Sequence, residues 1–496
     1  MSTSSLTDRV LALADQSASL LGDLAAAELE PIRAALREPI RVAVVGRVKA
    51  GKSTLVNALL GQRVAPTDVG ECTRVVTWYR YGHPERVDVL LRDGSTRAVQ
   101  LQSDGLLPAT LNMDPQQVAS LQVRLSNTTL RDLTLIDTPG LASVNEETSA
   151  ATEELLSLDH LSSDAASRAQ ALAFVVNETV RADEVDVLRR FRATAGEIDV
   201  SAANAIGVLT KADKVGGGSE DRSLATATVM AERLAKRLRS ELGTVIPVVG
   251  LLAETAEAAL LTENDAANLA RLAQLTAEER TALLLSPDRF LSRPAPLSRP
   301  ERERLLALLD LFGIERALEW IDQGVRGADR LRAEFRGLSG VGRLRALLVQ
   351  AFRHHDDALR ARWGLNAIDA LGFDRRFPES ARRRLRDRAE QVRLDPEMHT
   401  MAELDALHLC ASGEVTLPDP LLEEVRRIAG GADLASRLGA ESSDAAALRR
   451  AAVEGAARWR RFRSTGASPR QATVAQAIIR SYELAWEQLD VDAVPS

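Results

Sequence analysis

A glycine-rich loop between a strand and a helix constrains the fold of this chain more than any other feature. Residues 46–53 read GRVKAGKS and match the pattern G-x-x-x-x-G-K-[ST]. The apolar run at residues 40–45 predicts a buried strand before the loop, and residues 54–60 predict a helix after it. A strand, a loop of this kind and a helix in succession predict an α/β fold.

The same loop predicts a phosphate-binding site. Its glycines allow backbone N–H groups to surround a β-phosphate at the N-terminus of the following helix. In this pattern the Lys52 ammonium bridges the β- and γ-phosphates, and the Ser53 hydroxyl holds Mg²⁺. The residues expected to contact the nucleotide here are Gly46, Arg47, Val48, Lys49, Ala50, Gly51, Lys52, Ser53 and Thr54.

A second motif, LTLIDTPG at residues 133–140, supplies a carboxylate. Its apolar strand brings Asp137 to the carboxyl edge of the sheet, where Asp137 can bind Mg²⁺ through water, and the Gly140 N–H can reach a γ-phosphate oxygen. The pattern D-x-P-G on its own is a common turn. Its position about 90 residues after the phosphate loop, at the end of an apolar strand, favours the metal site.

A third motif, Thr210-Lys211-Ala212-Asp213, follows an apolar strand at residues 203–209 and has the form [NT]-K-x-D. The Asp213 carboxylate can accept hydrogen bonds from the N1–H and the exocyclic amine of guanine, while the Lys211 stem lies across the base. Adenine presents the opposite donor pattern and would leave this carboxylate unpaired. The motif therefore predicts GTP as the substrate rather than ATP; the alternative is a solvated turn after a strand.

The polar, turn-rich segment between the first two motifs, residues 66–74, occupies the place of a first switch. A threonine in such a segment closes on Mg²⁺ when GTP is bound. Thr73 is the expected residue and Thr67 is the alternative. A threonine that only caps local structure is the other interpretation.

Composition narrows the class of protein further. The formal charge of −7 argues against a general nucleic-acid binder, and two cysteines give no disulfide framework, which favours the cytoplasm. No apolar run approaches the ~20 residues of a membrane span. Lysine is scarce: of 63 basic residues only five are lysines, and four of these, Lys49, Lys52, Lys211 and Lys214, lie in or beside the motifs.

The motifs, together with helical segments before and after them, resemble the dynamin superfamily. The segments at residues 51–59, 65–68 and 71–78 are similar to actinobacterial dynamin-like proteins of the isoniazid-inducible type, as are the late segments 426–431 and 458–463. This resemblance implies a GTPase head, a neck of N- and C-terminal helices and a helical trunk. It also implies self-association through the heads, action on membranes and often a second dynamin-like partner chain.

The expected organisation follows from this resemblance and from the apolar pattern. Alternating strands and helices predict an α/β GTPase domain with a mostly parallel mixed sheet, and the later part of the chain predicts an elongated all-α neck and trunk. The expected limits are residues 1–37 for N-terminal neck helices, 38–325 for the GTPase domain and 326–496 for the helical neck and trunk. Pro31 is expected to begin the second helix, and residues 341–371 to form one helix about 45 Å long.

Two residues depart from the family's pattern. Eukaryotic dynamins carry glutamine and serine where this chain has Val48 and Lys49, and the glutamine helps to position the attacking water. Leu141 follows Gly140, so that position offers no glutamine either. We therefore expect slow basal GTP turnover. Lys49 occupies the place of an internal arginine finger in guanylate-binding relatives. Our hypothesis is that Lys49 supplies a cation when two heads meet; the alternative is a solvated loop lysine. The expected catalytic residues are Lys49, Lys52 and Thr73, and the expected metal ligands are Ser53, Thr73 and Asp137.

Two basic segments are candidates for peripheral contact with acidic membrane lipid: residues 382–388 and 458–463. The alternative is charged helix surface with aromatic side chains in the core. The leading interpretation is a cytoplasmic dynamin-like GTPase, peripheral on the inner face of the cell membrane, that remodels or repairs membranes. The alternatives are a ribosome-assembly GTPase of the Era kind, which would carry a basic RNA-binding module, and a GTP-regulated scaffold with little catalysis.

Overall fold

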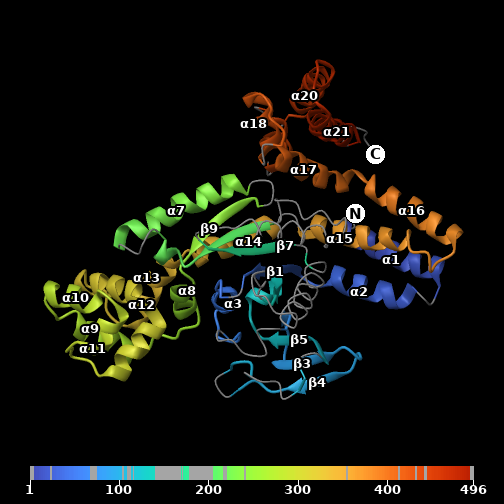
Figure 1. Cartoon of the computed structure of the whole chain (residues 1–496). Coiled ribbons are helices and arrows are strands. Elements are labelled where there is room, and N and C mark those ends of the chain that lie inside the picture. The colour runs from blue at the N-terminus through green and yellow to red at the C-terminus, as the bar shows by residue number, and fades with distance from the viewer. Residues whose placement is uncertain are drawn as a thin grey trace, which may run out of the picture.

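The computed structural model describes residues 5–22, 25–47, 49–66, 75–102, 105–108, 113–114, 117–139, 169, 171–177, 205–215, 220–238, 242–353, 356–411, 414–430, 433–440 and 444–491. Within these residues a nine-stranded sheet has the order β4-β3-β5-β2-β6-β1-β7-β8-β9 (Figure 1). Its strands are β1 Ile40–Gly46, β2 Thr77–Tyr81, β3 Arg86–Leu91, β4 Thr96–Val99, β5 Val118–Leu125, β6 Leu133–Asp137, β7 Ala171–Val176, β8 Ala205–Thr210 and β9 Thr244–Val248. Five of the eight neighbouring pairs are parallel, which confirms the expected mostly parallel mixed sheet.

The central strands are buried along their whole length because both faces of the sheet are covered. Every residue of β1, β6, β7 and β8 is buried, as the continuous apolar runs in the sequence predict for parallel strands between helices. In the register of the parallel strands, Val44 of β1 lies opposite Asp137 of β6, and Gly46 lies opposite Val175 of β7. The carboxyl ends of these strands therefore meet at one edge of the sheet, where the motifs lie.

Helices cover the two faces of the sheet with different parts of the chain. One face packs in a hydrophobic cluster with the helices that follow β8, and the other packs with α3 and with helices from both ends of the sequence. The helices of the head are α3 Lys52–Leu60, α4 Thr129–Asp132, η5 Ala212–Lys214, α7 Glu220–Arg237, α8 Gly250–Glu257, α9 Glu263–Leu272, α10 Ala277–Leu284, α11 Pro287–Ser292, α12 Arg299–Asp322 and α13 Ala328–Ser339. Figure 1 shows α9–α13 gathered at one end of the sheet.

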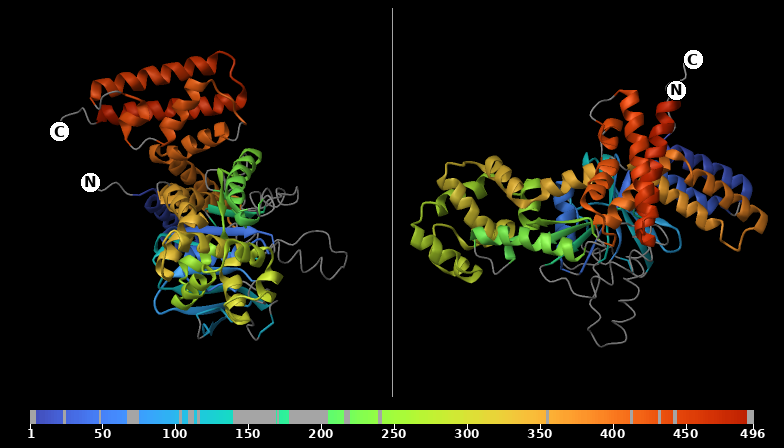
Figure 2. Two further views of the ribbon diagram at one scale, coloured as in Figure 1. Left: turned by 90° about the vertical axis from the view of Figure 1, so that its left-hand side faces the viewer. Right: turned by 90° about the horizontal axis from the view of Figure 1, so that it is seen from above.

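At the other end of the sheet, a neck forms from helices far apart in the sequence: α1 Leu6–Leu21, α2 Ala26–Arg37, α15 Asp356–Leu371 and α16 Glu379–Arg393. The backbone N–H groups of Leu6 and Thr7 donate to the Asp357 carboxylate at 2.7 and 3.0 Å, so a residue of α15 caps the first turn of α1. This arrangement confirms the expected neck of N- and C-terminal helices (Figures 1 and 2).

Two expectations about these helices are wrong. Pro31 lies inside α2 rather than at its start, since α2 begins at Ala26 and buries Leu29 and Ile32 on both sides of the proline. This apolar stripe extends the helix past a residue that lacks an N–H donor. In place of one helix over residues 341–371, the structure has α14 Val341–Arg353 and α15, and residues 354–355 lie outside the described part.

The last helices form a trunk module with its own core. They are η6 Pro396–Met398, α17 His399–Ala411, α18 Asp419–Gly430, α19 Leu434–Leu438, α20 Ala445–Ser464 and α21 Pro469–Val491. Trp459 and Tyr482 are among the largest buried side chains of this third hydrophobic cluster, and Figure 2 shows the α20–α21 hairpin extending across the module. No helix in the described residues is both long and apolar enough to cross a membrane. The domain limits at residues 37 and 325 remain a prediction.

Candidate nucleotide-binding site

The phosphate loop has a backbone that requires glycine at two positions. A Cβ atom on Gly46 would lie 2.6 Å from the carbonyl oxygen of Val175, so only glycine lets β1 approach β7 this closely. Gly51, the residue before α3, has φ 94°, which places it in the left-handed region. Lys49 also has a positive φ, 61°, without being glycine. The loop thus turns sharply enough to present the N-terminus of α3 to the space above the sheet.

Lys52 is the first residue of α3, and its charge is held inside the loop. Its side chain is 8% exposed, and Nζ donates a hydrogen bond to the backbone oxygen of Arg47 at 3.0 Å. Burial lowers the pKa of Lys52, and attraction to Asp137 opposes this shift. A poorly solvated ammonium at a helix N-terminus attracts phosphate oxygens strongly, because those oxygens replace the water it has lost.

Ser53 and Asp137 come together as the motifs predict. Ser53 Oγ donates to Asp137 Oδ2 at 3.3 Å, across 84 positions of sequence. Burial raises the pKa of Asp137 to about 6, against the opposing effects of Lys52 and of the hydrogen bond from Ser53. Asp137 Oδ1 is buried and has no hydrogen-bond partner among the described residues. A hydroxyl beside an unsatisfied carboxylate oxygen is a donor set that fits Mg²⁺.

The predicted base-recognition motif is attached to the phosphate loop by two hydrogen bonds. Thr210 Oγ1 donates to the backbone oxygen of Ala50 at 2.6 Å, and Lys211 Nζ donates to that of Lys49 at 3.1 Å. Lys211 has φ 54°, so the chain turns sharply there before Asp213. Burial raises the pKa of the half-buried Asp213 carboxyl. The phosphate loop and the base-recognition motif therefore lie together at one edge of the sheet.

Three predicted site residues, Val48, Thr73 and Gly140, lie outside the described residues, as does the alternative Thr67. Lys49 is among the described residues, and its side chain is exposed in the loop. Gly46, Arg47, Ala50, Gly51 and Thr54 lie on β1, in the loop or on the first turn of α3. The structure thus brings the described members of the three motifs together at one site.

Sequence reasoning missed a polar network behind the loop. Asn57 of α3 is fully buried; its Nδ2 donates to Glu254 Oε1 at 2.8 Å, and its Oδ1 accepts from the N–H groups of Val64 and Ala65 at 3.0 and 2.8 Å. Glu254 is 3% exposed, and burial raises its pKa. The available signal was a polar side chain at an apolar position in each helix, LVNALL in α3 and GLLAETAE in α8.

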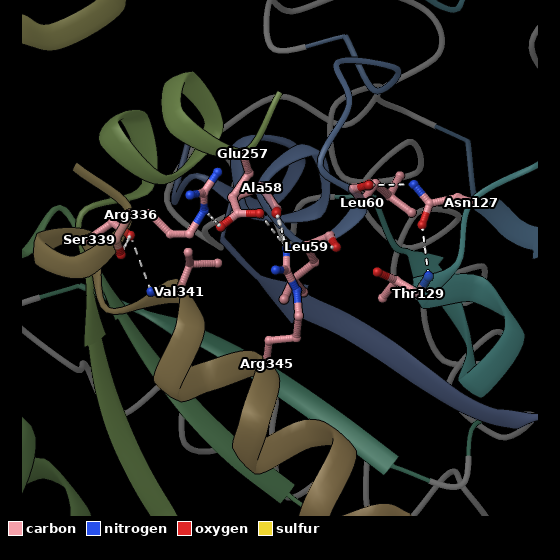
Figure 3. A network of polar contacts seen from close by, with 10 residues as sticks. All are labelled: Ala58, Leu59, Leu60, Asn127, Thr129, Glu257, Arg336, Ser339, Val341 and Arg345. Atoms are coloured by element: carbon pink, nitrogen blue, oxygen red, sulfur yellow. Dashed lines mark hydrogen bonds and ion pairs between the residues drawn. The ribbon is translucent and has the colours of Figure 1, made fainter. Parts of the chain in front are cut away.

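A second missed contact lies at the other end of α3 (Figure 3). Arg345 of α14 donates to the backbone oxygens of Ala58 and Leu59 at 3.0 and 3.3 Å, and it pairs with Glu257 at 3.1 Å. Glu257 also pairs with Arg336 of α13 at 2.9 Å. The last carbonyl groups of a helix have no partners inside the helix. A residue of α14 therefore supplies donors to the C-terminal end of the phosphate-loop helix.

In the basic segment at residues 458–463, Trp459 lies in the core and Phe462 is partly buried against it. Trp459 is fully buried and lies edge-to-face with Phe462, with 5.8 Å between ring centroids. Arg458 pairs with Glu424 at 2.6 Å, and Arg460 pairs with Glu483 at 2.7 Å. This segment therefore matches the alternative interpretation of charged helix surface over a core.

The fold and the site define a GTPase built on a glycine-rich phosphate loop, with a helical neck and trunk attached. Comparison with known proteins identifies the family. Residues 42–212 match the model of the dynamin family. The isoniazid-induced protein IniC of Mycobacterium tuberculosis is 35% identical over 430 residues, which cover 84% of each chain. The chain therefore belongs to the dynamin family, as a bacterial dynamin-like GTPase.

Two further likenesses are more limited. The bacterial dynamin-like protein of Nostoc punctiforme is 45% identical over 53 residues, 11% of this chain and 8% of its own. A solved structure of an oligomerised bacterial dynamin pair aligns over 99% of this chain and 88% of its own, at 13% identity and a TM-score of 0.36.

Proposed function

We propose that this chain binds GTP together with Mg²⁺, hydrolyses GTP slowly, and uses the nucleotide state to move the neck against the head during membrane association, remodelling or repair. The family supports GTP hydrolysis in general. The contact between Arg345 and the C-terminal end of α3 is the observation that supports coupling between the nucleotide site and the neck.

The chain's own residues have distinct roles in the binding step. Lys52 and the N–H groups at the start of α3 bind the β- and γ-phosphates, and Asp213 accepts from the guanine edge while Lys211 lies across the base. Ser53 and Asp137 would hold Mg²⁺, and Thr73 of the first switch would supply a further ligand. When bound, this ion offsets the negative charge of the phosphates. The Gly140 N–H would donate to a γ-phosphate oxygen, so the segment after Gly140 would lose this contact when GTP is hydrolysed.

The coupling follows from the two ends of α3. Its first turn forms the phosphate site, and its last carbonyls bind Arg345, so a shift of α3 on phosphate binding displaces α14. Glu257 joins Arg345 to Arg336, one on each side of the joint between α13 and α14. At that joint Gly340 has φ 78°, and a Cβ atom there would lie 2.5 Å from the backbone oxygen of Pro247. The joint thus packs tightly against the head.

Lys49 keeps two candidate roles in catalysis. In the first, its ammonium offsets transition-state charge when two heads meet, a contribution that reaches 10³–10⁵ for arginine fingers. Its positive φ and its exposure in the phosphate loop support this role. In the second it is a solvated loop lysine. Turnover by Lys49→Ala, measured with and without potassium, separates them, because a normal rate in both conditions eliminates the first role.

The proposed partners are a second copy of this chain through the heads, a second dynamin-like protein, and acidic lipid on the inner face of the membrane, with the chain otherwise in the cytoplasm. Of the two basic segments, residues 382–388 of α16 keep an accessible aromatic neighbour. Phe373, at the turn before α16, is 62% exposed, and the Arg386 guanidinium lies 5.1 Å from its ring centroid. Acidic lipid attracts each basic residue near its surface by about 1 kcal/mol.

The coupling is tested with Arg345→Met, which keeps the aliphatic stem and removes the donors. Fluorophores on Ser95→Cys in the head and Arg375→Cys in the neck, with Cys72 and Cys410 replaced by serine, should report a GTP-dependent change that Arg345→Met reduces while GTP affinity stays within about threefold. Arg343→Met is the matched control on the exposed face of α14. An unchanged signal in Arg345→Met rejects this route of coupling.

The wider function is tested by GTP turnover with liposomes of acidic or neutral lipid, and with ribosomes. Stimulation by acidic liposomes supports membrane action. Stimulation by ribosomes supports the Era-like alternative, and GTP binding without turnover under all conditions supports a scaffold.

A further inference from the structure

Helix α12 is interrupted at a residue with a strained backbone. Asp310 has φ 52° and ψ −179°, a conformation that is almost restricted to glycine. Its own Oδ1 accepts a hydrogen bond from the N–H of Leu311 at 2.7 Å. The chain just before the break is fixed to the head, because Thr255 Oγ1 donates to the backbone oxygen of Leu308 at 2.6 Å. Surrounding contacts thus hold an aspartate where glycine would fit without strain.

The carboxylate of this strained residue reaches the base-recognition motif. Asp310 Oδ2 lies 2.9 Å from Lys214 Nζ. Lys214 ends the short turn η5, which begins directly after Lys211 and contains Asp213. The Lys211 ammonium is bound to the phosphate loop, so η5 is attached at both ends: to the loop through Lys211 and to α12 through Lys214.

We propose that Asp310 is a positioning residue for guanine recognition: it holds Lys214 and thereby fixes the place of the Asp213 carboxylate. This inference rests on the proposed function, in which Asp213 binds the base. A three-residue turn has a single hydrogen bond of its own, here from Lys214 N to Lys211 O at 2.9 Å, so attachments outside the turn determine its orientation. Carboxylate recognition of two donors depends on that orientation.

An ordinary surface ion pair is the competing explanation, since Lys214 is 62% and Asp310 32% exposed, and such pairs contribute little to stability. The strain separates the two explanations. Asp310→Gly removes both the carboxylate and the steric strain, so the free protein should keep or raise its melting temperature while its affinity for GTP falls. An ordinary surface ion pair would instead leave the affinity for GTP unchanged in Asp310→Gly.

The test measures the Kd of a fluorescent GTP analogue and the melting temperature of the full chain. Asp310→Asn and Lys214→Met should each weaken binding about threefold to fivefold, and the double variant should weaken it no further than either one. Asp322→Asn, which breaks the ion pair of α12 with Arg280, is the control and should leave the Kd unchanged. Wild-type affinity in both single variants, or additive losses in the double variant, overturns the proposal.

Asp213→Asn separates this proposal from the base assignment. It should lose GTP affinity and gain affinity for xanthosine triphosphate. If it does so while the Asp310 and Lys214 variants bind GTP normally, only the positioning role fails. If Asp213→Asn binds GTP as the wild type does, the base assignment and the positioning role fail together.

Discussion

The nucleotide site of the head and the core of the trunk both bury charged side chains, and they treat them in opposite ways. In the trunk, Glu424 is 4% exposed; it accepts two hydrogen bonds from Arg458, at 2.6 and 3.1 Å, and a further one from the Tyr482 hydroxyl. In the head, Asp137 keeps one buried oxygen that has no partner among the described residues, and Lys52 donates to a backbone oxygen. Buried charges that satisfy one another hold helices together, while a buried charge with unused capacity indicates a ligand site.

The largest expected effect concerns the head. Lys52→Ala should abolish GTP binding, a loss of more than about 3 kcal/mol, because the phosphates lose their principal cation. The melting temperature of the nucleotide-free protein should fall little, since removing a poorly solvated ammonium also removes its desolvation cost. Isothermal titration with GTP and thermal unfolding measure the two quantities. Lys236→Ala, an exposed lysine on α7, is the control; a large loss of stability in Lys52→Ala would break the comparison.

The next effect concerns the trunk and has the opposite signature. Glu424→Ala should lower the free energy of unfolding by about 2 kcal/mol, because the Tyr482 hydroxyl loses its buried acceptor and Arg458 its partner. GTP affinity should stay as in the wild type. Denaturant unfolding measures the first effect. Glu423→Ala, which removes an exposed pair with Arg426, should change little; nucleotide binding lost in Glu424→Ala would show that the regions are not separate.

A smaller effect should appear as a pH dependence of the trunk. Burial lowers the pKa of His399, whose Nε2 lies 2.9 Å from the backbone oxygen of Ala477 and 3.0 Å from Ser481 Oγ. The native state thus holds the neutral ring, while the unfolded chain takes up a proton below about 6.5. Stability should therefore be fully present above this value and fall as the pH drops below it, by at most about 1.4 kcal/mol per pH unit.

Unfolding of His399→Gln at pH 7 and pH 5, compared with the wild type, measures this effect. Equal losses of stability in both proteins would assign the acid sensitivity to other groups.

The features that are easiest to predict from the sequence are those determined by residues close together in the chain. The glycines of the phosphate loop and the apolar strands β1, β6, β7 and β8 are readable because a tight turn and full burial each restrict residue type locally. The prediction that α2 begins at Pro31 is wrong because the extent of this helix depends on packing against α1 and α15, which outweighs the local preference.

The missed residues act over long sequence separations. Asn57 contacts Glu254 across 197 positions, and Arg345 contacts Ala58 across 287. The break in α12 lies at an aspartate, Asp310, rather than at a glycine or proline. No local pattern specifies which distant groups will meet, so these contacts emerge only once the chain is folded.

The cap that Asp357 provides to α1 has a consequence for biosynthesis. Asp357 is 351 and 350 positions from the residues that it contacts, so the ribosome releases the start of α1, which Ser5 caps locally, long before these two further hydrogen bonds can form. At roughly 5–20 residues per second, that interval is on the order of tens of seconds. All the strands of the head leave the ribosome during this interval, whereas the neck cannot form until α15 has been synthesised. The order of synthesis thus gives the GTPase head time to form before the neck closes around the two distant ends of the chain.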